Sequence, residues 1–92
     1  MITVKFYSLL RIHLQVKELQ FSGRFDSILL LLKTCESKLG KEFINLIAER
    51  DLKINNSTIV LLNGRNVKHL QELETPVEDQ DVLSVFPPAG GG

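Results

Sequence analysis

The residues with the clearest chemical potential form the last segment of the chain, Val85-Phe86-Pro87-Pro88-Ala89-Gly90-Gly91-Gly92. The segment opens as a strand, and its two prolines stop the strand because they have no backbone N–H. Three glycines without side chains then fit a tunnel that admits only a main chain. We expect Gly92 to end this tail with a free carboxylate that an enzyme can reach. The alternative interpretation is an inert linker.

The rest of the sequence contains no recognisable catalytic constellation. His13 and His69 have no other metal-ligand residues at suitable spacing, so each is interpreted as a surface histidine. Cys35 lies on an apolar stripe without a nearby histidine, which favours a small buried residue over a nucleophile. No glycine-rich loop precedes a helix, so no nucleotide site is expected. The chain is therefore predicted not to be an enzyme and to bind no cofactor or metal itself.

Composition restricts the class of protein. The 92 residues make one domain, and fractions of 43% hydrophobic and 24% charged residues are typical of a soluble globular protein. A net charge of zero argues against nucleic acid or an anionic membrane as a partner. The single cysteine, the lack of a signal peptide and the short apolar run Ile28–Leu32 predict a cytoplasmic protein without a membrane span.

Charge is unevenly distributed along the chain. From Leu70 to Gly92 there is no lysine or arginine, whereas this stretch contains the carboxylates of Glu72, Glu74, Glu78, Asp79 and Asp81. One interpretation is a solvated turn region. The other is an acidic collar beside the tail that steers it toward a basic partner surface.

The start of the chain predicts two strands. Apolar and polar residues alternate over residues 2–7, so one face is buried and Tyr7 falls on the other. A loop is expected at residues 11–13. A second strand is expected over residues 15–21, in which Val16 is out of phase and indicates either a bulge or a later start.

One main helix follows in the prediction. Asp26 or Ser27 is the expected N-cap, because a short oxygen-bearing side chain accepts the first free N–H groups. Apolar residues at helical spacing form one stripe over residues 28–39, and Gly40 suits the left-handed residue that ends such a helix. A short second helix is expected over residues 41–49.

The second half of the chain predicts three more strands. Residues 58–62 are rich in strand formers, and Asn63-Gly64 is a strong hairpin signal because both turn residues tolerate positive φ. Residues 65–68 form the expected return strand. The last strand, residues 82–86, is expected to place Phe86 on its outer face.

The segment from Val82 to Gly92, preceded by Asn63-Gly64 and Asp79-Gln80-Asp81, resembles the MoaD/ThiS family of ubiquitin-like sulfur carriers, most closely the small subunit type of molybdopterin synthase. The family commonly has Asp-Gly-Asp where this chain has Asp79-Gln80-Asp81. The resemblance implies an α+β, β-grasp (ubiquitin-like) fold, with a mixed sheet over one main helix. It also implies a β-grasp domain over residues 1–88 and a flexible Gly-Gly tail over residues 89–92.

In the β-grasp fold the first and last strands are neighbours, so the resemblance brings Tyr7 and Phe86 together. They are expected either to form one exposed aromatic patch that anchors a partner or to be partly covered by loops of the domain. The implied partner-binding set also includes Pro87, Pro88 and Ala89.

The resemblance implies that Gly92 is the reactive residue and that Gly90 and Gly91 form the narrow tail before it. It also implies that an E1-like adenylyltransferase uses ATP and Mg²⁺ to adenylate Gly92 and that a sulfur donor converts the adenylate into a thiocarboxylate. The tail is then expected to enter an acceptor enzyme, such as the large catalytic subunit of molybdopterin synthase, and to give its sulfur to a bound precursor.

Three functions remain open from the sequence. The first is a sulfur carrier, for molybdopterin or alternatively for thiamine or cysteine biosynthesis. The second is a protein modifier joined to target lysines through Gly92. The third is a binding module whose tail is inert.

Overall fold

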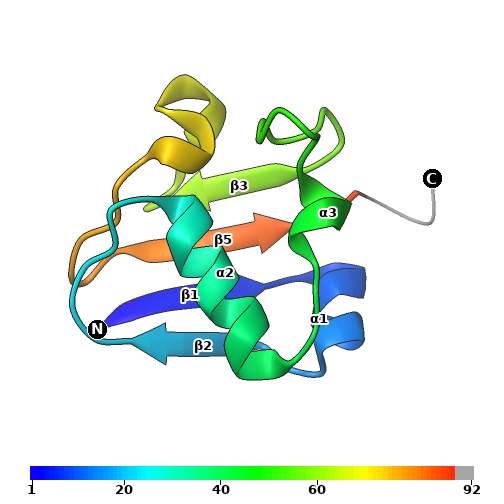
Figure 1. Cartoon of the computed structure of the whole chain (residues 1–92), viewed down its shortest axis with the longest axis horizontal. Coiled ribbons are helices and arrows are strands. Elements are labelled where there is room, and N and C mark those ends of the chain that lie inside the picture. Colours follow the sequence, from blue (N-terminus) through cyan, green and yellow to red (C-terminus); the bar gives the residue numbers. More distant parts are fainter. Residues whose placement is uncertain (89–92) are drawn as a thin grey trace.

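The computed structural model describes residues 1–88 and shows one mixed sheet with its main helix lying across one face (Figure 1). The strands are β1 (Ile2–Phe6), β2 (Glu18–Phe21), β3 (Ile59–Leu62), β4 (Arg65–Asn66) and β5 (Val82–Phe86). Their order in the sheet is β2-β1-β5-β3-β4. β1 and β5 run parallel, and the other neighbouring pairs are antiparallel.

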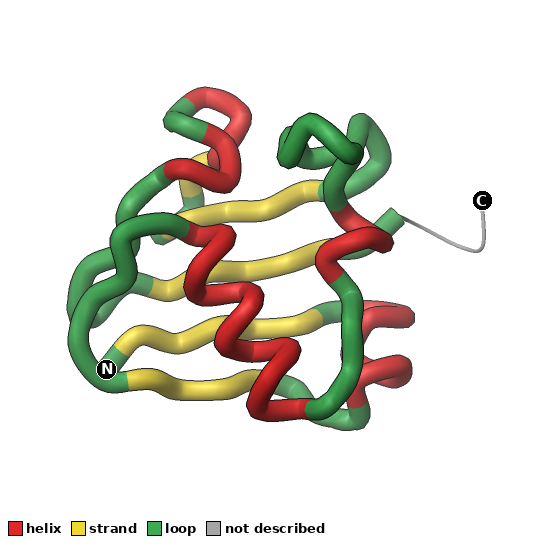
Figure 2. The backbone as a smooth tube through the Cα atoms, in the orientation of Figure 1, coloured by secondary structure: helices red, strands yellow, loops and turns green. Residues whose placement is uncertain are grey.

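The helices are α1 (Ser8–Leu14), α2 (Ile28–Leu39) and α3 (Ile44–Ile47), with short 3₁₀ turns η1 (Val67–His69) and η2 (Glu72–Glu74). α2 crosses the sheet diagonally, as Figure 2 shows most simply. α1 and α3 both lie at the end of the sheet where β5 finishes (Figure 1). This end therefore holds two short helices and the point from which the chain continues past Pro88.

The core lies between the sheet and α2. Alternate residues of the strands point toward α2 and are buried, among them Ile2, Val4, Phe6, Val60, Leu83 and Val85. α2 contributes the buried stripe Ile28, Leu31, Leu32 and Cys35. The ring of Phe43 closes the core against Phe6 in an edge-to-face contact with centroids 5.4 Å apart. This mixed sheet over one main helix confirms the architecture that the family resemblance implied.

The two ends of α2 follow from their local sequence. The Ser27 hydroxyl accepts a hydrogen bond from the backbone N–H of Leu30 at 3.1 Å, so Ser27 rather than Asp26 is the N-cap. Asp26 instead pairs with Arg24 at 3.0 Å. Gly40 ends the helix with φ 68°, the left-handed conformation that glycine adopts readily.

The prediction of a loop at residues 11–13 is wrong, because these residues belong to helix α1. Leu10 and Leu14 lie four positions apart and are both buried, which fixes the helix on the core. The sequence hides this helix because Leu9 and Ile12, on its other side, are apolar but exposed. As a consequence Tyr7 is not a strand residue but the extended residue that precedes α1.

Three other elements are shorter than predicted. β2 begins at Glu18, so Val16 precedes the strand and the later start is confirmed. α3 begins only at Ile44, because the Glu36 carboxylate accepts hydrogen bonds from the N–H groups of Phe43 and Ile44 and anchors this turn. The return strand after the hairpin ends at Asn66, whose side chain accepts from Lys68 N–H and starts η1.

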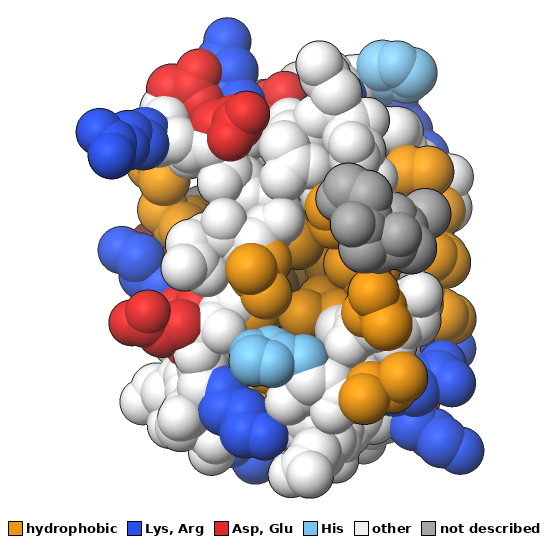
Figure 3. All heavy atoms as spheres, turned by 90° about the vertical axis from the view of Figure 1, so that its right-hand side faces the viewer, with side chains coloured by type: hydrophobic (Ala, Val, Ile, Leu, Met, Phe, Trp, Pro, Cys, Tyr) orange, Lys and Arg blue, Asp and Glu red, His pale blue; other side chains and the backbone are white. Residues whose placement is uncertain are grey.

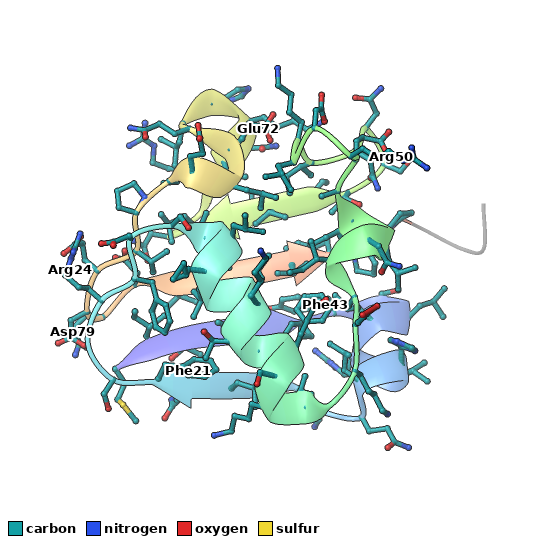
Figure 4. All side chains as sticks on the ribbon, viewed as in Figure 1. Phe21, Arg24, Phe43, Arg50, Glu72 and Asp79 are labelled. Carbon is teal, nitrogen blue, oxygen red and sulfur yellow. The ribbon has the colours of Figure 1, made fainter. Side chains whose placement is uncertain are left out.

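Of the two interpretations of the acidic stretch, the acidic collar beside the tail is wrong. Asp79 accepts a hydrogen bond from the N-terminal amine of Met1 at 2.7 Å, and Glu78 pairs with Arg24 at 3.4 Å. These groups precede β5, whereas Pro87 follows it, so they lie at opposite ends of the sheet. Figure 4 shows Asp79 and Arg24 together at the end far from the exit of the chain. Glu72 is also engaged within the domain, because its carboxylate accepts from the N–H of Ile54.

Candidate functional site

β5 positions the candidate site because a neighbouring strand pairs with it on each side over most of its length. It pairs with β1 through residues 82–85 and with β3 through residues 83–86. The N–H of Tyr7 donates to Val85 O at 3.2 Å, just beyond the last paired residue of β1. The ladder then stops at Pro87 and Pro88, which have no N–H and are half-buried. The chain therefore leaves the domain from a firmly held strand.

The structure brings Tyr7 and Phe86 together beside this exit. Their rings stack with centroids 4.3 Å apart and an interplanar angle of 10°, and both residues are half-buried. The guanidinium carbon of Arg11 lies 5.4 Å from the centre of the Tyr7 ring. Arg11 is held there because its Nε donates to Phe6 O at 3.1 Å. The two rings thus form one aromatic patch, partly covered by the domain itself, and its role in binding a partner stays a prediction.

The sequence analysis missed a third apolar residue on this patch. Ile59 is the register partner of Phe86 on the neighbouring strand β3, and it is 48% exposed. The signal for it was present, because buried Val60 and Leu62 require Ile59 and Leu61 to face outward. We call Tyr7, Phe86 and Ile59 the sheet patch.

The end of the domain itself also exposes apolar side chains that the sequence analysis did not identify. Leu9 and Ile12 on α1 and Leu46 on α3 are 49%, 70% and 48% exposed. Figure 3 looks onto this end and shows apolar side chains gathered around a hollow. α1 and α3 are short, so hydrophobic periodicity gave no signal for the exposed side.

The remaining predicted site residues, Ala89, Gly90, Gly91 and Gly92, lie outside the described residues. The structure reaches Pro88, which places the start of this segment at the end of β5. Gly92 as the reactive residue therefore remains a prediction.

Other potential chemistry within residues 1–88 is accounted for structurally. Burial raises the pKa of the Cys35 thiol to about 12, so the predicted structural role of this residue is supported over a nucleophilic one. His13 Nε2 lies 3.4 Å from Glu42 O, which ties the end of α1 to the segment before α3. No group of three metal-binding side chains occurs among the described residues.

Two open hollows of about 540 Å³ each lie beside α2, and one of them is also lined by Ile44 and Asn45 of α3. Leu29 and Leu52 contribute to both, and neither is lined by a residue of the sheet patch. In residues 1–88, no helix is long and apolar enough to cross a membrane.

A profile of the ThiS family matches residues 17–92. The chain belongs to the ThiS family. The resemblance to the MoaD/ThiS ubiquitin-like sulfur carriers is therefore confirmed, and the matched range includes β5 and the four residues after Pro88.

Two curated relatives of this ThiS-family chain match over shorter segments. One is small archaeal modifier protein 3 of Haloferax volcanii, 54% identical over 33 residues, which are 36% of each chain. The other is a putative sulfur carrier protein of Archaeoglobus fulgidus, 36% identical over 53 residues, which are 58% of this chain and 59% of the relative. The chain thus spans less than two thirds of the length of each of these two curated relatives.

Similarity to a solved structure extends over the whole domain. The crystal structure of the Amycolatopsis orientalis BexX/CysO complex contains a chain with a TM-score of 0.78 and 26% identity, with all of both chains covered. This likeness confirms the β-grasp fold of the ThiS-family chain.

Proposed function

We propose that this protein is a sulfur carrier that acts through a thiocarboxylate on Gly92. The observation that carries the proposal is the end of β5. In a chain of the ThiS family, a strand paired on both sides runs into Pro87-Pro88 beside the sheet patch and continues as Ala-Gly-Gly-Gly. In this proposal, a rigid body presents a narrow segment, with no side chain larger than the Ala89 methyl group, next to the sheet patch as the proposed partner-binding surface.

The chemistry begins with activation, because a carboxylate is a poor electrophile. An oxygen of the Gly92 carboxylate attacks the α-phosphorus of ATP, and pyrophosphate leaves. A persulfide on the sulfur donor then attacks the acyl carbon, and AMP leaves. A second thiol cleaves the resulting acyl disulfide by thiol–disulfide exchange, which releases the thiocarboxylate and a donor disulfide. ATP and Mg²⁺ are held by an E1-like adenylyltransferase, and this chain contributes the acyl group.

The body of the carrier supplies binding energy that the tail needs. Ordering each tail residue in a tunnel costs roughly 1–2 kcal/mol, and glycine has more freedom to lose than other residues. Backbone hydrogen bonds to the tail and burial of the sheet patch against the partner offset this cost. The A. orientalis neighbour was crystallised in complex with BexX, which supports the proposal that carriers of this shape act while docked on partner proteins.

The proposed sulfur acceptor is the large catalytic subunit of molybdopterin synthase, with cyclic pyranopterin monophosphate as the bound precursor. Acceptor enzymes of thiamine and cysteine biosynthesis are the alternatives within sulfur carriage. Chemically prepared thiocarboxylate carrier is incubated with each acceptor and its precursor. The acceptor that returns the carrier to the carboxylate form while gaining sulfur in its product identifies the pathway.

A second candidate function is protein modification, in which the same adenylate ends as an isopeptide bond to a target lysine. The segment 54% identical to small archaeal modifier protein 3 favours keeping this candidate. Intact mass of the protein isolated from cells discriminates between the two. A gain equal to replacing one oxygen by sulfur supports carriage, whereas a series of larger conjugates that disappears on deletion of Gly91-Gly92 supports modification.

The direct test of the proposed function is charging in vitro. The protein is incubated with the E1-like adenylyltransferase of the same organism, ATP, Mg²⁺ and a persulfide donor, and its mass is followed. We expect first release of pyrophosphate and then the sulfur-for-oxygen mass gain. An unchanged mass with a competent enzyme, or full cellular function after deletion of residues 89–92, would select the inert-tail alternative.

A further inference from the structure

The end of the domain where β5 finishes carries an apolar surface separate from the sheet patch. We call its three exposed aliphatic residues the end face: Leu9, Ile12 and Leu46. Ile12 is the most exposed of the large apolar residues of the domain, at 70%. Figure 3 shows that apolar side chains on this end surround a hollow. Contiguous exposed apolar surface of this kind usually marks an interaction site.

The end face is held in place before any partner arrives. The Lys41 side chain donates to His13 O at 3.0 Å, and His13 Nε2 lies 3.4 Å from Glu42 O. These contacts fasten the last turn of α1 to the segment that leads into α3. The Asn55 side chain donates to Leu46 O at 3.2 Å and fixes α3 from the other side. A pre-formed surface loses little conformational entropy on binding.

The short separation between Pro88 and Gly92 limits which protein can cover this surface. Gly92 is the fourth residue after Pro88, so four residue steps join the two. Fully extended, they reach at most about 14 Å, at up to about 3.6 Å per residue. β5 points toward the end that carries α1 and α3 (Figure 1). An active site that holds Gly92 in an extended tunnel must therefore lie within about 14 Å of Pro88, and the protein around that site faces the end face.

We propose that the E1-like adenylyltransferase docks on the end face, with an apolar side chain from its surface in the hollow and contacts to Leu9, Ile12 and Leu46. This inference rests on the proposed function, because it assigns the binding surface for the enzyme that activates Gly92. The end face supplies ground-state binding of the carrier, and Gly92 supplies the reacting atoms.

The test is steady-state adenylation by the E1-like adenylyltransferase of the same organism, measured as pyrophosphate release at varied carrier concentration. Ile12→Asp is expected to raise KM about tenfold or more and to leave kcat within about twofold, because it removes binding distant from the reacting atoms. Ile12→Ala keeps helix propensity and is expected to raise KM in the same direction but less. Circular dichroism melting verifies that both variants fold.

Leu30→Asp is the matched control. Leu30 is 51% exposed, and it lies in the first turn of α2 rather than on α1 or α3. It is expected to leave KM unchanged. If the wild-type protein is charged but folded Ile12→Asp and Ile12→Ala keep the wild-type KM, or if Leu30→Asp raises KM equally, the docking proposal is overturned while the carrier function stands. If the wild-type protein is never charged, the proposed function itself falls.

Discussion

The two ends of the sheet differ in chemistry although the same strand, β5, connects them. Where β5 begins, polar groups satisfy one another: Asn63 Nδ2 donates to the Asp81 carboxylate at 2.8 Å, and Asp81 accepts from Glu78 N–H at 2.8 Å. Where β5 finishes, Leu9, Ile12 and the sheet patch expose apolar side chains. We call the first end, where polar groups of the domain pair with one another, the closed end. We call the second end, where exposed apolar side chains can be covered by another protein, the open end.

This difference indicates a division of labour. Polar contacts within the domain stabilise a single fold but leave nothing for a partner to satisfy. Exposed apolar groups do not stabilise the free protein. They contribute favourable binding free energy only when a second surface covers them. Changes at the closed end should therefore alter stability and spare charging, and changes at the open end should do the reverse.

The largest effect is expected for Gly91→Ala. A methyl group in a tunnel shaped for the main chain displaces the neighbouring carboxylate, and displacement by about 1 Å can cost on the order of 100-fold in rate. We expect adenylation to slow by about that factor, with an unchanged melting temperature. Pyrophosphate release and circular dichroism measure the two quantities. Normal sulfur transfer by this variant would argue against a tight tunnel.

At the closed end, Asp81→Ala is expected to lower the free energy of unfolding by about 2 kcal/mol. The carboxylate accepts from both Asn63 Nδ2 and Glu78 N–H, and hydrogen bonds to a charged group contribute about 1.5–3 kcal/mol. Urea denaturation gives the stability, and adenylation kinetics at a temperature where the variant is folded give the second readout. A rise in KM for the adenylyltransferase would break the proposed separation of the two ends.

Phe86→Ala tests the open end at the sheet patch. Removing the ring leaves Tyr7 without its stacking partner, and truncation of an aromatic anchor at an interface commonly weakens binding about tenfold or more, or about 1.4 kcal/mol. Isothermal titration with the partner enzyme measures the loss. Ser84→Ala, on the same face of β5 two residues earlier, is the control and should bind normally. Equal losses for both variants would contradict a localised patch.

The sequence predicted the hairpin and the alternation of the last strand better than it predicted the open end. Asn63-Gly64 and the alternation of residues 82–86 are local signals, and the hairpin and the outward position of Phe86 followed from them. The end face was missed because Leu9, Ile12 and Leu46 belong to helices of seven and four residues, too short for a clear period. The acidic collar failed for another reason: nearness in sequence to the tail did not mean nearness in space, since β5 separates Asp81 from Pro87.

A smaller effect is expected at Gln80, where the family commonly has glycine. Gln80 adopts φ 75°, a left-handed conformation that is strained for a residue with a Cβ atom. Gln80→Gly is therefore expected to raise the free energy of unfolding by about 0.5–1 kcal/mol. Gln80→Ala distinguishes backbone strain from an effect of the side chain, because alanine removes the amide group but keeps the Cβ atom and therefore the strain. Equal stability of the two variants would show that the backbone conformation is not responsible.

The smallest effect concerns the ion pair that joins Met1 to Asp79. The hydrogen bond from the N-terminal ammonium holds the pKa of the Asp79 carboxyl below its usual range. A carboxyl whose pKa is lowered by folding stabilises the protein above its unfolded pKa of about 3.9, and this contribution is lost as the pH falls through the lower folded value. Asp79→Asn should therefore melt slightly below the wild type between about pH 5 and 7, and the difference should shrink below about pH 4.

Thermal melts across this pH range measure the difference, with charging at pH 7 as the second readout. Acetylation of the Met1 amine is the matched control, because it removes the cation and leaves the carboxylate in place. When both proteins are acetylated, the difference in melting temperature between the wild type and Asp79→Asn should no longer depend on pH. A difference that persists at pH 2 would assign the effect of Asp79 to packing of the turn rather than to charge. Because both groups are exposed, a reduced rate of charging would show that this end, too, meets the partner.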